Sequence, residues 1–462
     1  MKTEAFPKAY RHISDGNPSE DYFIFLGVVI LGVLDVRILK ENAHEFVAKW
    51  PVLGGQQIKT TSPFTFTTGT TVDFESRHIP SELNDILAID ISLSPTTTKK
   101  ASYRSYNNNS ASNDDLFHFS STFNPPPNIF VIRVTTLNNA TLLGFQTTHA
   151  LCDAQALYEV VKSYRDLVSG LDIPKIVLSP AVEIPLSTLI EDPLDLDHQS
   201  ESAFLGAPLV FNPFTILSKA EVDVKWYDKQ VELASREKGK ELYVHLTANL
   251  VQGWQDDCQR EIEEAASSGM LEEASGIKLT KNDVLTAWFL KENYATSGSK
   301  AIELSYSFNY RKALPSLSEG TTYLHNSYYD LLIPFPDINS LPLSRIALVI
   351  RLAVLLNSQP GVVRNILRFW EGAKGGVTPG PPGCKIRDLV YVTSWTRFNL
   401  IGMDWSAALA GPGEGKVVWA SPSLPMGDQA SINYKPFAIT MKDGAEGYWV
   451  RAWTFEDGHK EH

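Results

Sequence analysis

The sequence predicts an α/β protein built as two domains. A chain of 462 residues exceeds what one hydrophobic core usually supports. Runs of β-branched and aromatic residues are interspersed with runs of helical periodicity. Between residues 179 and 213, several prolines and the acidic run 191–197 form a connection too long for the inside of a compact domain. We therefore expect domains over residues 1–190 and 221–462, joined by a crossover over 191–220.

Composition narrows the class of protein. A hydrophobic fraction of 43% with 20% charged residues is ordinary for a globular chain. The net charge of −12, without any basic run, argues against a nucleic-acid partner. Cys152, Cys258 and Cys384 lack metal-ligand spacing and suit a reducing compartment. We expect a cytoplasmic monomer without a bound metal.

The first strongly apolar run is Tyr22–Leu34. It is too short to span a bilayer, and Asp35 and Arg37 follow at once. No basic segment precedes it and no cleavage-like site follows it, so it is not a secretory signal. Its glycines and β-branched residues favour a buried strand, followed by a helix over Ile38–Trp50.

A hairpin and a helix are expected in the middle of the first domain. Residues 128–136 and 141–149 are apolar and β-rich, and 137–140 supplies the turn. Apolar residues recur at helical spacing from Ala154 to Val168, and Ser169-Gly170 ends that helix.

The second domain has fewer clear signals. Strands are predicted over Val222–Trp226 and Glu241–Leu246, and an acidic helix over Ala248–Ala266. The patch Tyr106–Asp115 in the first domain reads as a solvated loop. The glycine- and proline-rich segment Gly372–Cys384 is expected to border a cleft.

His149 lies where the predicted hairpin gives way to the helix, with Asp153 four residues later. An imidazole held there is a candidate general base. The spacing alone is weak, because His78 and Glu82 repeat it in a polar segment. Asp153 could simply be a helix N-cap and His149 a hydrogen-bonded core histidine. Cys152 is interpreted as packing at the helix start, with a nucleophile as the second reading.

Other catalytic signatures are missing from the sequence. It contains no Gly-x-Gly-x-x-Gly after a strand, no Walker-type loop and no Gly-x-Ser-x-Gly elbow. It also contains no His-Glu-x-x-His and no Cys-x-x-Cys pair. The segment 372–383 has too many prolines to cradle a phosphate with consecutive amides.

Five blocks, taken in order, resemble the BAHD family of coenzyme A-dependent acyltransferases, particularly its fungal trichothecene acetyltransferase-like members. They are Glu45–Gly55 (EFVAKWPVLGG), His149–Asp153, Lys278–Trp288 (KLTKNDVLTAW), Asn309-Tyr310-Arg311 with Pro315 and Asn326-Ser327, and Val392–Phe398 (VTSWTRF) with Met403-Asp404-Trp405. The blocks span almost the whole chain. Each block alone is unspecific, and it is the order and spacing of all five that support the resemblance to the family.

The resemblance implies a fold of two pseudo-equivalent domains of the chloramphenicol acetyltransferase-like type. Each domain would be a mixed β-sheet packed with helices, and the active-site channel would run between them. Acyl-CoA, most simply acetyl-CoA, would enter one end and an apolar acceptor alcohol, such as a terpenoid or polyketide, the other. His149 would then remove the hydroxyl proton in a ternary complex, without an acyl-enzyme.

The resemblance also assigns roles to other residues. Asp153 would turn away from the substrate and pair with Arg311 to fix the His149 loop. Thr393 and Trp395 would lie beside the developing oxyanion, and both side chains carry a suitable donor. Core packing is the alternative reading for Trp395.

Three residues of the third block are candidates for the coenzyme phosphates. They are Lys278, Thr280 and Lys281, with a solvated helix start as the alternative. No permanently bound cofactor and no membrane span are expected.

The last block departs from the family's Asp-Phe-Gly-Trp-Gly pattern. This chain reads Asp404-Trp405-Ser406, followed by an altered stretch up to Gly413. In the family this motif is mainly structural, so the departure bears on loop geometry first. It also keeps open a protein that has the fold without turnover, and an amine acceptor remains the alternative among enzymes.

Overall fold

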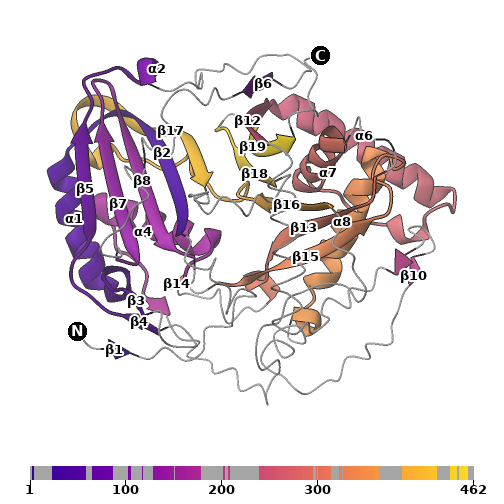
Figure 1. Cartoon of the computed structure of the whole chain (residues 1–462), viewed down its shortest axis with the longest axis horizontal. Coiled ribbons are helices and arrows are strands. Elements are labelled where there is room, and N and C mark those ends of the chain that lie inside the picture. The colour runs from indigo at the N-terminus through magenta and orange to yellow at the C-terminus, as the bar shows by residue number, and fades with distance from the viewer. Residues whose placement is uncertain are drawn as a thin grey trace.

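The computed structural model describes most of the chain. The described residues are 3–4, 23–58, 65–86, 102–105, 117, 128–149, 151–177, 201–202, 207–208, 239–294, 298, 300–313, 322–324, 326–363, 388–423, 437–444 and 447–455. Two sheets, each with helices against one face, stand next to each other and form the two halves of the molecule (Figure 1). The predicted α/β architecture with two sheets is confirmed.

The first sheet has five strands in the order β17-β2-β8-β7-β5. The strands are β2 (Phe23–Leu34), β5 (Asp73–His78), β7 (Phe130–Thr136), β8 (Ala140–Thr148) and β17 (Leu409–Ser423). Only the β5–β7 pairing is parallel within this sheet. Helices α1 (Val36–Lys49) and α4 (Ala154–Val168) cover one face (Figure 1). Phe46, Phe145 and Tyr164 join the sheet and helices in one aromatic core.

The second sheet has seven strands in the order β15-β13-β16-β18-β19-β12-β6. The strands are β6 (Ser102–Ser105), β12 (Gly239–Leu246), β13 (Ile302–Asn309), β15 (Tyr328–Phe335), β16 (Asp388–Ser394), β18 (Phe437–Lys442) and β19 (Tyr448–Phe455). Helices α6 (Ala248–Ser267), α7 (Lys281–Tyr294) and α8 (Leu343–Asn357) pack together against one face of it (Figure 1).

The remaining described elements are short. They are β1 (Thr3–Glu4), η2 (Pro51–Gly54), β3 (Gln57–Ile58), β4 (Thr65–Thr67), α2 (Leu83–Ile86), β9 (Ile176–Val177), β10 (Glu201–Ser202), β11 (Ala207–Pro208), η4 (Glu272–Ala274), η5 (Arg311–Ala313), β14 (Thr322–Tyr323) and η7 (Ser406–Ala408).

The two sheets exchange strands. β17 belongs to the last sixth of the chain, yet it pairs antiparallel with β2 of the first sheet. β6 precedes the His149 hairpin in sequence, yet it pairs with β12 at the edge of the second sheet. Figure 1 shows β17 in yellow, the colour of the C-terminus, beside the indigo strand β2. The residue limits proposed for the two domains stay a prediction.

The turn after α1 illustrates how the sequence forces local structure. Pro51 disfavours helical backbone angles in the residue before it, and Trp50 has φ −123° and ψ 72°, so α1 ends at Lys49 and a 3-10 turn follows. Gly55 is required because a Cβ there would lie 1.6 Å from the carbonyl oxygen of Thr67. The Gly55 carbonyl in turn accepts from the Ile129 amide at 2.9 Å. The first block of the sequence therefore anchors α1 to the hairpin that carries His149.

Most predicted elements agree with the structure to within two residues. The helix over 154–168 is observed as α4, the apolar run after Tyr22 is β2, and the acidic helix is α6. Ala140, expected in the hairpin turn, instead begins β8, because its carbonyl accepts from the Leu137 amide and closes a tighter turn. The segments 106–115, 222–226 and 372–384 lie outside the described residues.

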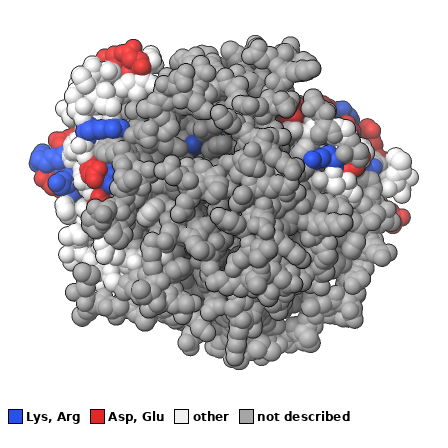
Figure 2. Space-filling model, viewed as in Figure 1, with Lys and Arg blue, Asp and Glu red and all other residues white. Residues whose placement is uncertain are grey.

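Figure 2 shows acidic and basic side chains intermixed over the described parts of both halves on one face of the molecule. That face carries no large basic patch among its described residues, as the net charge of −12 would lead one to expect. Among the described residues, no helix has both the length and the apolar character needed to cross a bilayer.

Candidate active site

His149 follows the last residue of β8 and lies between the two halves. Its side chain is 9% exposed, and its ring centroid is 5.7 Å from that of Tyr328 in β15. The His149 carbonyl accepts from the Asn326 side-chain amide at 2.7 Å. Both partners come from the second half of the chain, so the histidine is fixed from both sides.

Burial lowers the pKa of the His149 imidazole, although a hydrogen bond to its own backbone and the charge of Asp153 act in the opposite direction. Burial disfavours the charged imidazolium because the protein solvates it less well than water does. His149 is therefore neutral at physiological pH. A neutral imidazole can accept a proton, which is the state that a general base needs.

Asp153 and Arg311 form a buried ion pair across the two halves. Arg311 reaches both carboxylate oxygens, with Nη1 at 2.7 Å and Nη2 at 3.0 Å. The same carboxylate accepts from the amides of Ala156 at 2.9 Å and Ser327 at 2.8 Å, so Asp153 also caps α4. Two of the four contacts come from the Arg311 guanidinium and two from backbone amides. The carboxylate is thus occupied by structural partners, in keeping with a supporting role.

The face of the second sheet toward His149 is defined by strand alternation. In β15, Tyr329 and Leu331 pack into the core beneath α6, α7 and α8, whereas Tyr328 and Asp330 point to the other side and stay partly exposed. On β16, Thr393 lies on the same side as Tyr391, and Tyr391 pairs in register with Ser305 of β13. We call this side of the sheet the inner face.

The inner face carries a carboxylate that the sequence did not single out. The Ser307 hydroxyl donates to Asp330 Oδ1 at 3.0 Å, and Ser307 pairs in register with Asp330. Burial raises the pKa of Asp330 to about 6, while the hydroxyls of Ser307, Ser305 and Tyr391 lower it. A run such as Tyr328-Tyr329-Asp330 gives no chemical signal until the fold places Tyr328 beside His149 and the strand register places Asp330 opposite Ser307.

Thr393 and Trp395 lie at the end of β16, in different environments. Thr393 is partly exposed on the inner face. Trp395 is 3% exposed, contacts Phe398 edge-on at 5.4 Å, and donates its backbone amide to the Thr440 carbonyl at 2.8 Å. Trp395 thus takes part in core packing, and Thr393 is the more accessible of the two candidate oxyanion donors.

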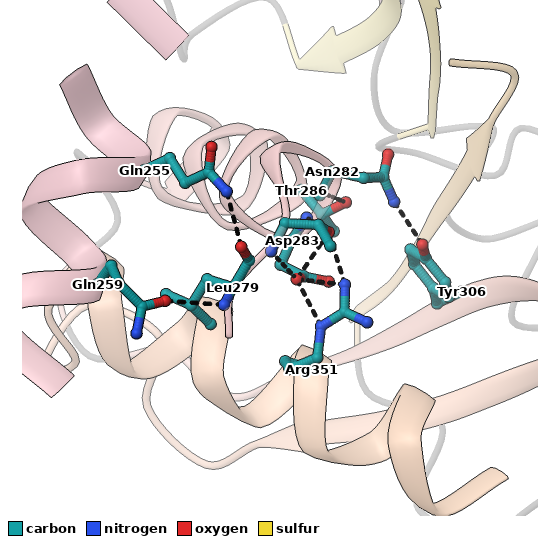
Figure 3. Close-up of polar contacts among 9 residues, drawn as sticks. Gln255, Gln259, Leu279, Asn282, Asp283, Thr286, Tyr306 and Arg351 are labelled. Atoms are coloured by element: carbon teal, nitrogen blue, oxygen red, sulfur yellow. Dashed lines mark hydrogen bonds and ion pairs between the residues drawn. The ribbon is translucent and has the colours of Figure 1, made fainter. Parts of the chain in front are cut away.

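The candidate phosphate residues surround the start of α7. Thr280 and Asp283 form a capping box, in which the Thr280 amide donates to Asp283 Oδ2 at 2.7 Å. Arg351 of α8 donates to the same carboxylate oxygen at 2.7 Å through Nε (Figure 3). Lys278, whose side chain is 76% exposed, pairs with Glu263 at 2.7 Å. The side chains of Thr280 and Lys278 therefore already bind other residues of the chain, Asp283 and Glu263 respectively.

Lys281 is the remaining candidate, and it makes no ion pair within the part of the chain that the structure describes. Two arginines that sequence reasoning missed lie close by. Burial and then the charge of Asp283 raise the pKa of the Tyr306 hydroxyl, and the smaller effects of Arg351 and Arg397 lower it. Asn282, next to Lys281, donates to that hydroxyl (Figure 3). The start of α7 therefore has both signs of charge beside it: Arg351 is paired with Asp283, and Lys281 and Arg397 are the further cations there.

Cys152 is buried with no exposed surface, and burial raises the pKa of its thiol to about 12. The thiolate, which is the nucleophilic form of cysteine, is almost absent at neutral pH. This agrees with packing at the start of α4.

The altered fifth block is a turn that leads into β17. Trp405 is fully buried and stacks on Phe145 at 6.1 Å in the hydrophobic core that contains the first sheet. The Ser406 amide and hydroxyl both donate to Asp404 Oδ1. Gly415 has φ +66°, and a Cβ there would lie 2.4 Å from the Ser406 nitrogen. The serine therefore occupies a turn held by Asp404, and the block positions β17.

The fold and this site together define a class. Two mixed sheets that meet at a His-x-x-x-Asp segment, with the aspartate bound by an arginine of the other half, form the arrangement implied for a two-domain acyltransferase of the BAHD type. No protein-family model matches the chain. The acetyltransferase peniE of Penicillium patulum is 29% identical to it over 473 aligned positions, covering 93% of this chain and 91% of that protein.

Solved structures share the fold over nearly the whole chain. The structure of F. sporotrichioides TRI101 complexed with coenzyme A and T-2 superposes with a TM-score of 0.62, covering 96% of this chain and 94% of that one at 11% identity. Vinorine synthase gives a TM-score of 0.58, covering 99% and 91% at 11% identity. At such identity the structures show the fold alone. Together with the acetyltransferase homologue, they confirm the resemblance to the BAHD acyltransferases that the five sequence blocks indicate.

Proposed function

We propose that this protein is an acyl-CoA-dependent O-acyltransferase that transfers an acetyl group to a hydroxyl of an apolar secondary metabolite. The observation that carries the proposal is the buried, neutral His149 between the two sheets, held by Asn326 and backed by the Asp153–Arg311 pair. The peniE homologue is named an acetyltransferase, and TRI101 structures contain coenzyme A with T-2 or deoxynivalenol.

In the proposed reaction, His149 takes the proton of the acceptor hydroxyl as its oxygen attacks the thioester carbonyl. The resulting oxyanion accepts a hydrogen bond from Thr393, with Trp395 beside it. Collapse of the tetrahedral intermediate breaks the carbon–sulfur bond, and the imidazolium returns its proton to the coenzyme A thiolate. The ester and free thiol leave, so atoms and charges balance without an acyl-enzyme.

The coenzyme phosphates are proposed to bind at the start of α7. Lys281 and Arg397 supply cationic groups there, and the helix N-terminus favours an anion. Lys278 and Thr280 take part only if the pair with Glu263 and the capping box rearrange. Arg351 is committed to Asp283 and would contribute through its charge.

The test is release of free thiol from acetyl-CoA with a panel of hydroxylated terpenoids and polyketides. His149→Ala should remain folded and lose about 10²–10⁴-fold in kcat, because it removes a positioned base. His78→Ala is the matched control, since His78 also precedes an acidic residue by four positions but lies at the end of β5. Near-normal turnover by His149→Ala would contradict the mechanism.

A further inference from the structure

Asp330 is a carboxylate that the proposed acyl transfer leaves without a role. It is the second residue past Tyr328 along β15, on the inner face that carries the contact to His149. Two residues of a strand advance by about 6.6–6.8 Å. A fused-ring acceptor with its reacting hydroxyl at His149 would therefore extend past Tyr328 to the level of Asp330.

Asp330 also lies on the same face of the sheet as Thr393, the proposed oxyanion donor, close enough for one acceptor molecule to contact both. Ser307 pairs with Asp330 across β13 and β15, and it stands beside Thr393 of β16, one position beyond the registered pair Tyr306–Val392. Two strand spacings of about 4.8 Å separate Asp330 from Thr393. Tyr328, Asp330, Ser307 and Thr393 thus form one patch of the inner face, and each of them is partly exposed.

The carboxylate has unused capacity to accept hydrogen bonds. An ionised carboxylate offers about four lone-pair sites. Ser307 donates to one oxygen at 3.0 Å, and the hydroxyls of Ser305 and Tyr391 are the other protein donors that affect its pKa. Even if all three donate, about one site stays open. No described cation lies near enough to shift the Asp330 pKa, so the open site is not reserved for an ion pair within the described part of the chain.

We infer that Asp330 accepts a hydrogen bond from a second hydroxyl of the acceptor, one that does not react, and so determines which acceptor and which of its hydroxyls is acylated. The inference rests on the proposed function. Binding a donor group there satisfies the remaining lone pair, whereas an acceptor without that hydroxyl leaves a partly buried carboxylate short of a partner. A hydrogen bond to a charged group typically favours the ligand that makes it over one that lacks it by about 10- to 100-fold in binding.

At neutral pH, the ionised Asp330 side chain should make the folded protein less stable than a variant with a neutral residue at this position. Burial raises the pKa of Asp330 to about 6, above the ordinary 3.8, so the folded chain holds the proton more tightly than the unfolded chain does. Its contribution to stability is therefore complete below pH 3.8 and lost as the pH rises through about 6. Asp330→Asn should melt at an equal or higher temperature than wild type at pH 7. A loss of transfer in this variant then does not come from misfolding.

The experiment compares two acceptors, a rigid terpenoid diol and its mono-deoxy analogue that lacks the non-reacting hydroxyl, at saturating acetyl-CoA. Wild type should prefer the diol in kcat/KM by about 10- to 100-fold. Asp330→Ala should remove that preference, Asp330→Asn should retain part of it, and the KM for acetyl-CoA should stay unchanged in both. Asp256→Asn, an exposed carboxylate on α6, is the control for loss of one negative charge.

Three outcomes would overturn the inference. Equal losses on diol and mono-alcohol in Asp330→Ala would indicate a purely structural residue. A wild-type enzyme that acetylates both acceptors equally well would keep the proposed function and remove the role of Asp330. Preference for an analogue with an amine in place of the second hydroxyl would mean that the site selects a cation. If wild type released no thiol with either acceptor, the proposed function would fail together with the inference.

Discussion

Removing either partner of the Asp153–Arg311 pair should destabilise the protein by about 3–5 kcal/mol, because the orphaned charge stays buried. Asp153 and Arg311 are 4% and 7% exposed, so water cannot replace the missing partner. Asp153→Ala also removes the cap of α4, which adds about 1 kcal/mol. It releases the Ser327 amide as well, next to the Asn326 side chain that holds the His149 carbonyl. A shift of the histidine by about 1 Å can cost about 10²-fold in rate.

The assay is a double-mutant cycle with urea unfolding and thiol release as readouts. The double variant Asp153→Ala/Arg311→Ala should be little less stable than either single variant, which corresponds to a coupling energy about as large as one single loss, about 3–5 kcal/mol. Asp35→Ala is the matched control, because Asp35 caps α1 with bonds to Arg37 and Ile38 but forms no buried pair. It should cost only about 1 kcal/mol. Additive losses, or a stable Asp153→Ala enzyme that lacks only turnover, would mean that Asp153 acts on the substrate.

Two further predictions concern the same segment. Cys152→Ala should keep most activity, and intact-mass spectrometry of wild type with acetyl-CoA alone should show no added acetyl group; a stoichiometric adduct lost in the variant would contradict direct transfer. Because burial lowers the pKa of His149 below 6.5, kcat/KM should be level from about pH 7 to 8 and fall only well below pH 6.5. The lowered pKa also means that the stability from neutral His149 is complete above pH 6.5 and declines as the pH falls, so His149→Gln should be less acid-sensitive in urea unfolding. A rate that follows an unshifted histidine, or equal acid sensitivity of both proteins, would refute this.

Much of the local structure was predictable because it depends on neighbouring residues. Asp153 caps a helix whose apolar periodicity starts at the next residue, and α4 has the predicted bounds. The places of Tyr328 and Asp330 on the inner face were not predictable, because they depend on strand register and on how the two halves meet. The capping of α7 shows the same limit. Thr280 and Asp283 are close in sequence, but Arg351, which forms an ion pair with the Asp283 carboxylate, comes from another helix.

The partial exchange of strands between sheets has a consequence for how this chain is made. β2 leaves the ribosome early, whereas its neighbour β17 begins 375 positions after β2 ends. Until β17 arrives, the nascent first half presents an open hydrophobic edge, which is a site for misassembly with another chain. An N-terminal fragment that ends within 191–220 contains β2 but not β17, so the edge of β2 would stay unpaired. Two fragments expressed together should therefore restore a folded protein only by associating, and a fusion partner or stalling site placed before residue 409 would favour aggregation.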